Sequence, residues 1–139
     1  MNLSSTTIYI SAAIITNDKQ QLLLVRKKGS PYFMQAGGKI EANETPLQAL
    51  IRELQEELKL TVTAKQLRYI GHYSSTAANE INHMLSAVLY HLPLTAGNFN
   101  PAAELEEVRW MTIEQSQQLL LAPLTAEIII PIIKKTIFN

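Results

Sequence analysis

Residues 38–60 read GKIEANETPLQALIRELQEELKL, and this stretch carries the strongest local pattern in the chain. Thr45 followed by Pro46 is typical of a helix start, with the threonine as N-cap and the proline at the first helical position. Gln48 lies three residues after Thr45 and can complete a capping box. After Pro46, leucine and isoleucine residues recur at helical spacing and form one apolar stripe. We therefore expect an amphipathic helix that begins at Thr45 and packs against a core.

The same helix carries three glutamates on an arc that lies away from the apolar stripe. At about 100° per residue, Glu53, Glu56 and Glu57 fall together, and their carboxylates repel one another. Oxygen ligands of this kind suit Mg²⁺ or Mn²⁺, which would relieve the repulsion. Arg52 is placed to orient a neighbouring carboxylate through a charge-assisted hydrogen bond. Taken alone, such a helix face is most often a solvated surface.

Two glycines, Gly37 and Gly38, separate an aromatic and apolar run that starts at Tyr32 from this helix. Glycine permits a close backbone approach, so a carbonyl can reach a metal ion or an amide can reach a phosphate. Lys39 follows directly and is a candidate phosphate contact. A glycine pair alone is most often a turn.

The combined spacing resembles the Nudix box, Gx5Ex7REUxEExGU with U an aliphatic residue, which is found in hydrolases of nucleoside diphosphates linked to another group. The positions that match the pattern are Gly38, Glu44, Arg52, Glu53, Leu54, Glu56, Glu57 and Leu60. Lys59 stands where the family has glycine, and Ala36 stands where many members have proline. The resemblance implies an α/β fold of the Nudix type, an α/β/α sandwich with a mixed β-sheet between helices, in which residues 38–60 form a loop–helix–loop unit.

The resemblance also implies the metal ligands and the catalytic residues. Glu56 and Glu57 would be the principal ligands, with the carbonyl of Gly37 assisting and with Glu53 as general base or third ligand. Glu44 would be a secondary contact. The catalytic set would comprise Glu53, Arg52, Lys39 and Glu104.

Glu104 is included because family members often supply a further acidic residue from a later loop, ahead of a strand that contains an aromatic residue. The segment ELEEVRW offers Glu104, Glu106 and Glu107, and Glu104 lies six residues before Trp110. We therefore assign Glu104 to the metal site as well as to catalysis. A solvated acidic turn is the alternative interpretation.

Four residues are expected to contact the substrate. Gly38 and Lys39 would contact its phosphates, and Tyr32 and Phe33 would stack on its base. Aromatic residues near strands are more often part of a core, and that alternative stays open.

Composition limits the possible class of protein. The chain has 139 residues, a formal net charge of zero and no cysteine. It is long enough for one domain with its own core, and residues 1–139 are taken as a single Nudix domain. The absence of cysteine excludes disulfides and thiolate metal sites, and the balanced charge disfavours a nucleic-acid surface.

The first residues lack a cationic segment and their apolar run is too short to span a bilayer, so we expect a cytoplasmic protein without a membrane partner.

The remaining elements follow from local patterns. Strands are predicted at 7–16, 21–27, 66–75, 83–92 and 107–111, with a hairpin turn at 17–19. Thr112 is expected to cap a helix that runs to about Leu121. Residues 124–138 are expected to form a helix capped by Thr125, in which Pro131 removes one backbone hydrogen bond.

The resemblance implies a Mg²⁺- or Mn²⁺-dependent hydrolase that cleaves a phosphoanhydride bond. The sequence lacks the additional motifs of the ADP-ribose, diadenosine polyphosphate, coenzyme A and NADH branches, and it looks like the small mutator-type, MutT-like enzymes. We therefore expect an ordinary or oxidised nucleoside triphosphate as substrate, with a monophosphate and pyrophosphate as products. The alternatives are an ADP-ribose or nucleotide-sugar pyrophosphatase and a non-catalytic ligand-sensing domain. A monomer and a homodimer are equally compatible with the sequence.

Overall fold

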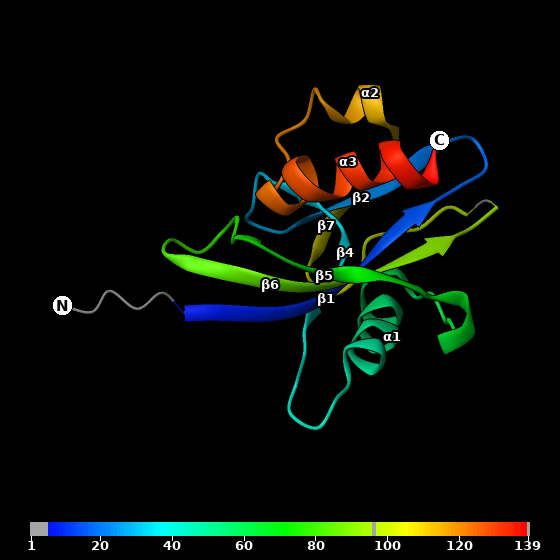
Figure 1. The fold of residues 1–139 in the computed structure, drawn as a ribbon. Helices are drawn as coiled ribbons and strands as arrows, with labels where there is room; N and C mark the ends of the chain where they lie inside the picture. The colour runs from blue at the N-terminus through cyan, green and yellow to red at the C-terminus, as the bar shows by residue number, and fades with distance from the viewer. Residues whose placement is uncertain (1–5, 96, 139) are drawn as a thin grey trace.

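The computed structural model describes residues 6–95 and 97–138. Its elements, in chain order, are β1 (Thr6–Thr16), β2 (Gln21–Lys27), β3 (Phe33–Met34), β4 (Ala36–Lys39), α1 (Pro46–Leu58), η1 (Ala64–Gln66), β5 (Arg68–Thr76), β6 (His83–Pro93), β7 (Leu105–Thr112), α2 (Ile113–Ser116), η2 (Thr125–Ile129), α3 (Ile130–Ile132) and η3 (Ile133–Ile137). The last three elements form one continuous helical run. Figure 1 shows α1 on one side of the sheet and this C-terminal run on the other. The predicted α/β/α sandwich is confirmed.

The sheet is mixed, as expected, and it is built around β1. Its strands follow the order β3-β2-β1-β6-β5, with β4 paired to β1 and β7 paired to β2. β1 and β6 run parallel, whereas the other pairs are antiparallel. β4 pairs with the segment of β1 from Ile10 to Ala13. This register places the glycine pair of β4 against the middle of the sheet.

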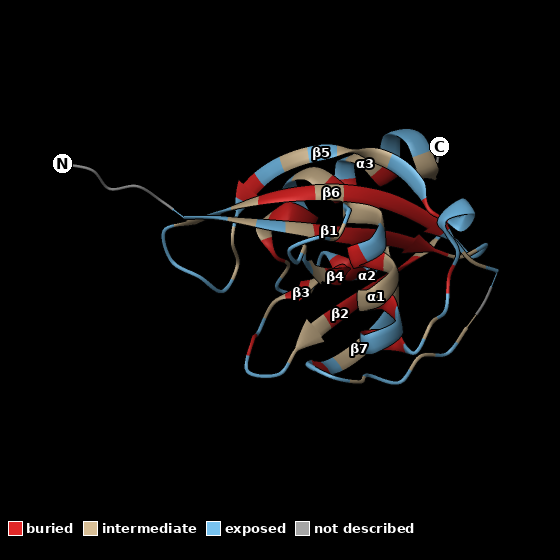
Figure 2. Ribbon diagram, turned by 90° about the horizontal axis from the view of Figure 1, so that it is seen from below, coloured by how far each residue is buried: buried red, intermediate tan, exposed pale blue. Residues whose placement is uncertain are grey.

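The alternation of side chains along β1 supplies two separate cores. Ala13 and Ile15 pack beneath α1, whereas Ala12 and Ile14 pack against the C-terminal helical run. Figure 2 shows the buried residues concentrated on β1 and β6. A strand that is buried on both faces has an almost continuous apolar sequence, which explains why residues 12–15 do not alternate with polar residues.

α1 begins at the predicted cap and ends at the residue that departs from the Nudix pattern. Thr45 Oγ1 accepts a hydrogen bond from the N–H of Gln48, and Gln48 Oε1 accepts one from the N–H of Thr45. At the other end Lys59 has φ 55° and ψ 33°, which is a left-handed conformation. The N–H of Leu60 then donates to the carbonyl of Leu54 at 3.2 Å. Lys59 therefore adopts the backbone geometry that glycine adopts at low cost after a helix.

Replacing Lys59 with glycine is expected to raise the free energy of unfolding by roughly 0.5–1 kcal/mol, because a side chain in the left-handed region costs about that much. Urea denaturation at equilibrium measures the change. Lys59→Ala is the matched control, since it removes the ammonium group but keeps the Cβ, and it should show no such gain. Hydrolytic activity should stay near the wild-type level in both variants, and its collapse would instead indicate that the ammonium group contacts the substrate.

α2 is shorter than the sequence predicted. Thr112 caps it through a capping box with Gln115, as expected, but the helix ends at Ser116 and does not reach Leu121. The backbone beyond it pairs with β3 instead. The N–H of Phe33 donates to the carbonyl of Leu120, and the N–H of Ala122 donates to the carbonyl of Phe33, both at 2.9 Å. This long-range pairing requires an extended chain where local pattern favoured a helix.

The C-terminal helical run is confirmed, but its predicted cap is wrong. Thr125 is fully buried and its hydroxyl donates to Gln35 Oε1 at 2.6 Å, so it does not cap the helix. Hydrogen bonds of the π type flank Pro131, which has no N–H to donate. Within the described ranges, every helix falls short of the length and apolar character needed to cross a membrane.

Candidate active site

The two glycines of β4 allow α1 and β1 to approach it closely. Gly37 has a φ of +145°, and a Cβ at this position would lie 2.2 Å from the carbonyl oxygen of Ser11 in β1. A Cβ on Gly38 would lie 2.5 Å from the carboxylate of Glu53 in α1. The absence of side chains here gives the helix glutamates access to the backbone of β4.

Glu57 is a buried carboxylate at this point of contact. Its residue is 2% exposed, and its Oε1 accepts a hydrogen bond from the N–H of Gly37 at 3.0 Å. Burial raises the pKa of Glu57 to about 8 and outweighs the opposing effects of Gly37 and Lys27. A carboxylate in this environment is charged at neutral pH only when a cation compensates for its lost hydration. The position suits a metal ligand.

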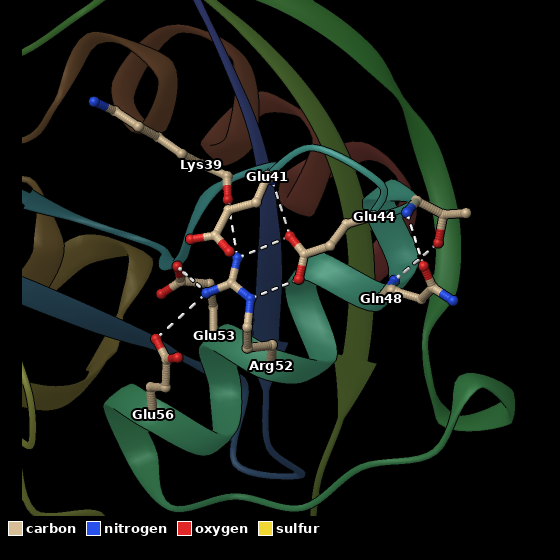
Figure 3. A network of polar contacts seen from close by, with 8 residues as sticks. Lys39, Glu41, Glu44, Gln48, Arg52, Glu53 and Glu56 are labelled. Carbon is tan, nitrogen blue, oxygen red and sulfur yellow. Dashed lines mark hydrogen bonds and ion pairs between the residues drawn. The ribbon is translucent and has the colours of Figure 1, made fainter.

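Arg52 stands at the centre of a polar network on the exposed side of α1 (Figure 3). It donates to Glu53 at 2.9 Å, a neighbouring carboxylate of the kind it was expected to orient, and to Glu56 at 3.4 Å. It also donates to the carbonyl of Lys39 at 3.1 Å. Burial raises the pKa of Glu53, and the hydrogen bond from Arg52 acts against that rise. Arg52 therefore fixes the direction of the Glu53 carboxylate and favours its charged form.

Glu44 holds Arg52 from the other side. Its two carboxylate oxygens accept from Arg52 Nε at 2.6 Å and from Nη2 at 3.0 Å. This hydrogen bonding, together with the N–H of Glu41, lowers the pKa of Glu44 to about 2. Glu44 was expected as a secondary metal contact. The structure places it on the guanidinium, where it positions Arg52.

The donors on α1 and β4 fit a divalent metal ion. Within residues 6–95 and 97–138, no three acidic or histidine side chains converge as a closed metal site. Glu53 and Glu56 are paired with Arg52 instead. The buried carboxylate of Glu57 lies one helical turn from Glu53. Carboxylate and carbonyl oxygens are the ligands that Mg²⁺ and Mn²⁺ prefer. The chemistry of the donor set therefore matches the predicted metal site.

Glu104 is brought beside this site by the backbone of its loop. The N–H of Ala102 donates to the carbonyl of Glu57 at 3.1 Å, and the N–H of Lys28 donates to the carbonyl of Glu104 at 2.8 Å. The side chain of Glu104 is 73% exposed and lies 3.9 Å from Lys27 Nζ. Burial is the largest cause of the raised pKa of Glu57, and the charge of Glu104 is a smaller cause in the same direction. The loop thus places the predicted residue next to the helix carboxylates.

Replacing Glu104 with glutamine should lower kcat far more than it raises KM, because a charge would be lost from the metal shell or the catalytic base. Steady-state kinetics with the best substrate measure both constants. Glu106→Gln is the matched control, since Glu106 is exposed in the same segment, and its effect should be mild. Equal effects at the two positions would indicate a general acidic loop and no specific ligand.

A pocket opens on the side of β4 that faces the C-terminal helical run. Its described lining residues are Ile8, Ile10, Ala12, Lys27, Met34, Gln35, Gly37, Gly38, Lys39, Thr76, Ala77, Ala78, Asn79, Glu80, Leu85, Ala122, Leu124 and Thr125. In Figure 3 the Lys39 side chain points away from the Arg52 network. The pocket therefore combines apolar walls with two lysines and shares the glycine pair with the carboxylate site. A base beside a phosphate chain has this combination of properties.

Two predicted substrate contacts lie elsewhere. Neither Tyr32 nor Phe33 is among the described residues that line the pocket. Phe33 is 5% exposed and packs in the core, with the guanidinium carbons of Arg26 and Arg109 at 5.9 and 5.2 Å from its ring centroid. The structure does not bring these aromatic residues together with the glycines and carboxylates.

Sequence reasoning assigned only Gly37, Gly38 and Lys39 among the described lining residues to the site, and the polar residues that it missed include Gln35, Lys27 and Thr125. Gln35 could have been noticed as a single amide within the otherwise apolar segment 33–36. Lys27 and Thr125 carry no local signal, because they join the pocket only through the folding of distant segments.

Comparison with known proteins identifies the family. The chain matches the NUDIX domain model over residues 7–131. It is 34% identical to the CTP pyrophosphohydrolase of Escherichia coli (strain K12) over 119 residues, or 84% of each chain. It is 26% identical to the ADP-ribose pyrophosphatase of Methanocaldococcus jannaschii over 125 residues, or 85% of this chain and 72% of that protein. The solution structure of the E. coli ORF135 protein is similar with a TM-score of 0.66 and 29% identity, covering 96% of this chain and 91% of that one.

The fold is an α/β/α sandwich in which an acidic helix packs against a glycine pair. The family model matches most of the chain that forms this sandwich. The chain belongs to the Nudix family of hydrolases, whose members generally use divalent metal ions.

Proposed function

We propose that this protein is a pyrophosphohydrolase that cleaves a nucleoside triphosphate into a nucleoside monophosphate and pyrophosphate. The observation that carries the proposal is the buried Glu57 carboxylate, which Gly37 holds at the edge of a pocket containing Lys27 and Lys39. A metal ion there would be Mg²⁺ or Mn²⁺. Its ligands would be Glu53, Glu56, Glu57 and Glu104, together with the carbonyl of Gly37.

The roles of the residues follow from their positions. When bound, the metal ion supplies charge neutralisation for the phosphates and lowers the pKa of a water molecule. Glu53, whose carboxylate is oriented by Arg52, accepts the proton of the attacking water. Lys39 and Lys27 lie on the pocket side and stabilise the charge that develops on the bridging oxygen.

The names of the relatives favour a nucleotide but differ in substrate. The CTP pyrophosphohydrolase is similar over most of both chains, which supports a triphosphate. The ADP-ribose pyrophosphatase supports a second candidate, cleavage of ADP-ribose or a nucleotide sugar. A non-catalytic sensor is disfavoured because the carboxylates of the box are all present.

A substrate screen tests the proposal. Nucleoside triphosphates, oxidised purine triphosphates, ADP-ribose and nucleotide sugars would be incubated with Mg²⁺ or Mn²⁺, and the products separated. Reaction in ¹⁸O-labelled water shows which phosphorus is attacked. Release of pyrophosphate from a triphosphate supports the proposal. Efficient cleavage of ADP-ribose alone would show that the protein is a hydrolase with a different substrate from the one proposed. Metal-dependent binding of nucleotides without cleavage would indicate a sensor.

The proposal also takes residues 1–139 as one catalytic domain that acts on free nucleotides in the cytoplasm. The formal net charge of zero supports a small-molecule substrate over a nucleic acid. A monomer and a homodimer are both compatible with the sequence. Light scattering on the purified protein distinguishes the two.

A further inference from the structure

The pocket contains a buried amide with an unused donor. Gln35 is 6% exposed and lies between β3 and β4 on the pocket wall. Its Oε1 accepts a hydrogen bond from Thr125, whereas its Nε2 is buried and has no partner among the described residues. An unpaired buried donor destabilises a folded protein, so its retention calls for an explanation. A ligand with a hydrogen-bond acceptor would supply the missing partner once the amide turns its NH₂ group toward the pocket.

Thr125 is the hydrogen-bond partner of the Gln35 amide oxygen. Its residue is completely buried, and its hydroxyl lies 2.6 Å from Gln35 Oε1. The hydroxyl donates to the carbonyl oxygen, and the NH₂ group has no partner among the described residues. The contact joins two segments 90 residues apart in sequence. It thereby ties the amide to the C-terminal helical run.

The surroundings of Gln35 suit a flat, largely apolar ring. Aliphatic residues Ile8, Ile10, Leu85 and Leu124 supply the walls, and the lysines at the glycine pair suit the phosphates. A second amide, Asn79, lies at the mouth, where its Oδ1 accepts from Ser30 at 2.7 Å. The carboxylate of Glu80, also a lining residue, is exposed there and can remain in water.

We propose that Gln35, held by Thr125, selects the base of the substrate by donating a hydrogen bond to a carbonyl oxygen on the edge of that base. Cytosine, uracil and guanine carry such an oxygen, and adenine does not. This inference rests on the proposed function and narrows it to nucleotides with a carbonyl-bearing base. Gln35 is then a specificity residue and takes no part in the cleavage itself.

Kinetics with CTP, UTP, GTP and ATP in Mg²⁺ test the selection. The best of the four for the wild-type protein should carry a base carbonyl, with kcat/KM about 10-fold or more above that for ATP. Gln35→Met should remove most of this ratio through KM. Gln35→Glu should lower kcat/KM for the carbonyl-bearing substrates relative to ATP, because a carboxylate cannot donate to a base carbonyl and repels it. Gln118→Met changes an exposed glutamine outside the pocket and should leave the ratio unchanged. ATP as the best substrate, or an unchanged ratio in Gln35→Met, would overturn the inference.

A second variant guards against unfolding, and a binding measurement separates this inference from the proposed function. Gln35→Leu with Thr125→Val replaces both polar partners by apolar ones, which preserves stability better than leaving one unpaired. It should also lose the preference for a carbonyl-bearing base.

Calorimetric binding of CMP, UMP, GMP and AMP requires no hydrolysis. A preference for the carbonyl-bearing monophosphates that Gln35→Met abolishes would support the inference even if no triphosphate is cleaved. Equal binding of all four would contradict it even if triphosphates are cleaved.

Discussion

Glu57→Gln is expected to lower turnover by roughly 100-fold or more while making the metal-free protein more stable. The substitution keeps the shape of the side chain and its acceptor for the Gly37 N–H, but it removes the negative charge that a metal ion requires. It also removes a buried carboxyl group whose ionisation is opposed by burial. Steady-state kinetics in Mg²⁺ and denaturant unfolding in a chelator measure the two effects.

The pH dependence of stability gives an independent measurement of the same group. The pKa of Glu57 is raised from 4.5 to about 8 in the folded protein. The folded state therefore holds its proton more tightly than the unfolded state, and this contribution to stability is fully present below pH 4.5. In a chelator, the wild-type protein should lose up to a few kcal/mol as the pH rises through 8. The Glu57→Gln variant should lack this loss, and added Mg²⁺ should reverse it in the wild type.

A glutamate far from the site provides the control. Glu114→Gln alters an exposed residue of α2 and should change neither turnover nor the pH profile. Glu56→Gln should lower turnover with little change in stability, because its side chain is 51% exposed. Near wild-type hydrolysis by both Glu56→Gln and Glu57→Gln would show that the metal site is assigned to the wrong residues.

Local periodicity was sufficient to predict α1 and its acidic arc. The cap at Thr45 and the separation of Glu53, Glu56 and Glu57 from the apolar stripe depend only on helical geometry and neighbouring residues. Periodicity could not indicate which glutamate is buried. Glu57 is buried, and Glu56 is not, because β4 approaches Glu57 through Gly37 and because the loop at Ala102 reaches its carbonyl.

The parts that could not be predicted are those that depend on pairing between distant segments. The end of α2 is determined by the pairing of residues 120–122 with Phe33. The role of Thr125 is determined by Gln35, although its sequence neighbours suggested a helix cap. The pairing of Glu44 with Arg52 likewise depends on the conformation of the loop that precedes α1. In each case a polar group for which the local sequence suggested one role forms its hydrogen bond with a partner that the local sequence does not indicate.

Gly37→Ala is expected to lower the free energy of unfolding by roughly 3–5 kcal/mol. A side chain at φ +145° is strained, and the new Cβ would lie 2.2 Å from the Ser11 carbonyl and 2.7 Å from the Cα of Ala12. Both contacts are with the backbone of β1 at the centre of the sheet, so neither can be relieved by rotating a side chain. Equilibrium denaturation in urea measures the loss, which should include a fall in Tm.

Alanine substitutions at two other glycines distinguish backbone strain from steric contact as causes of the lost stability. Gly29 has a φ of +79°, and a Cβ added there would meet no other part of the protein within 4 Å, so Gly29→Ala should cost only the backbone strain, about 1–2 kcal/mol. At Gly38 the contact is with the flexible carboxylate of Glu53 at 2.5 Å, so Gly38→Ala should displace that group and lower kcat with little loss of stability. A Gly37→Ala variant as stable as Gly29→Ala would mean that β1 and β4 can separate at this point. The close approach that brings Glu57 to the backbone of β4 would then not be required by the fold.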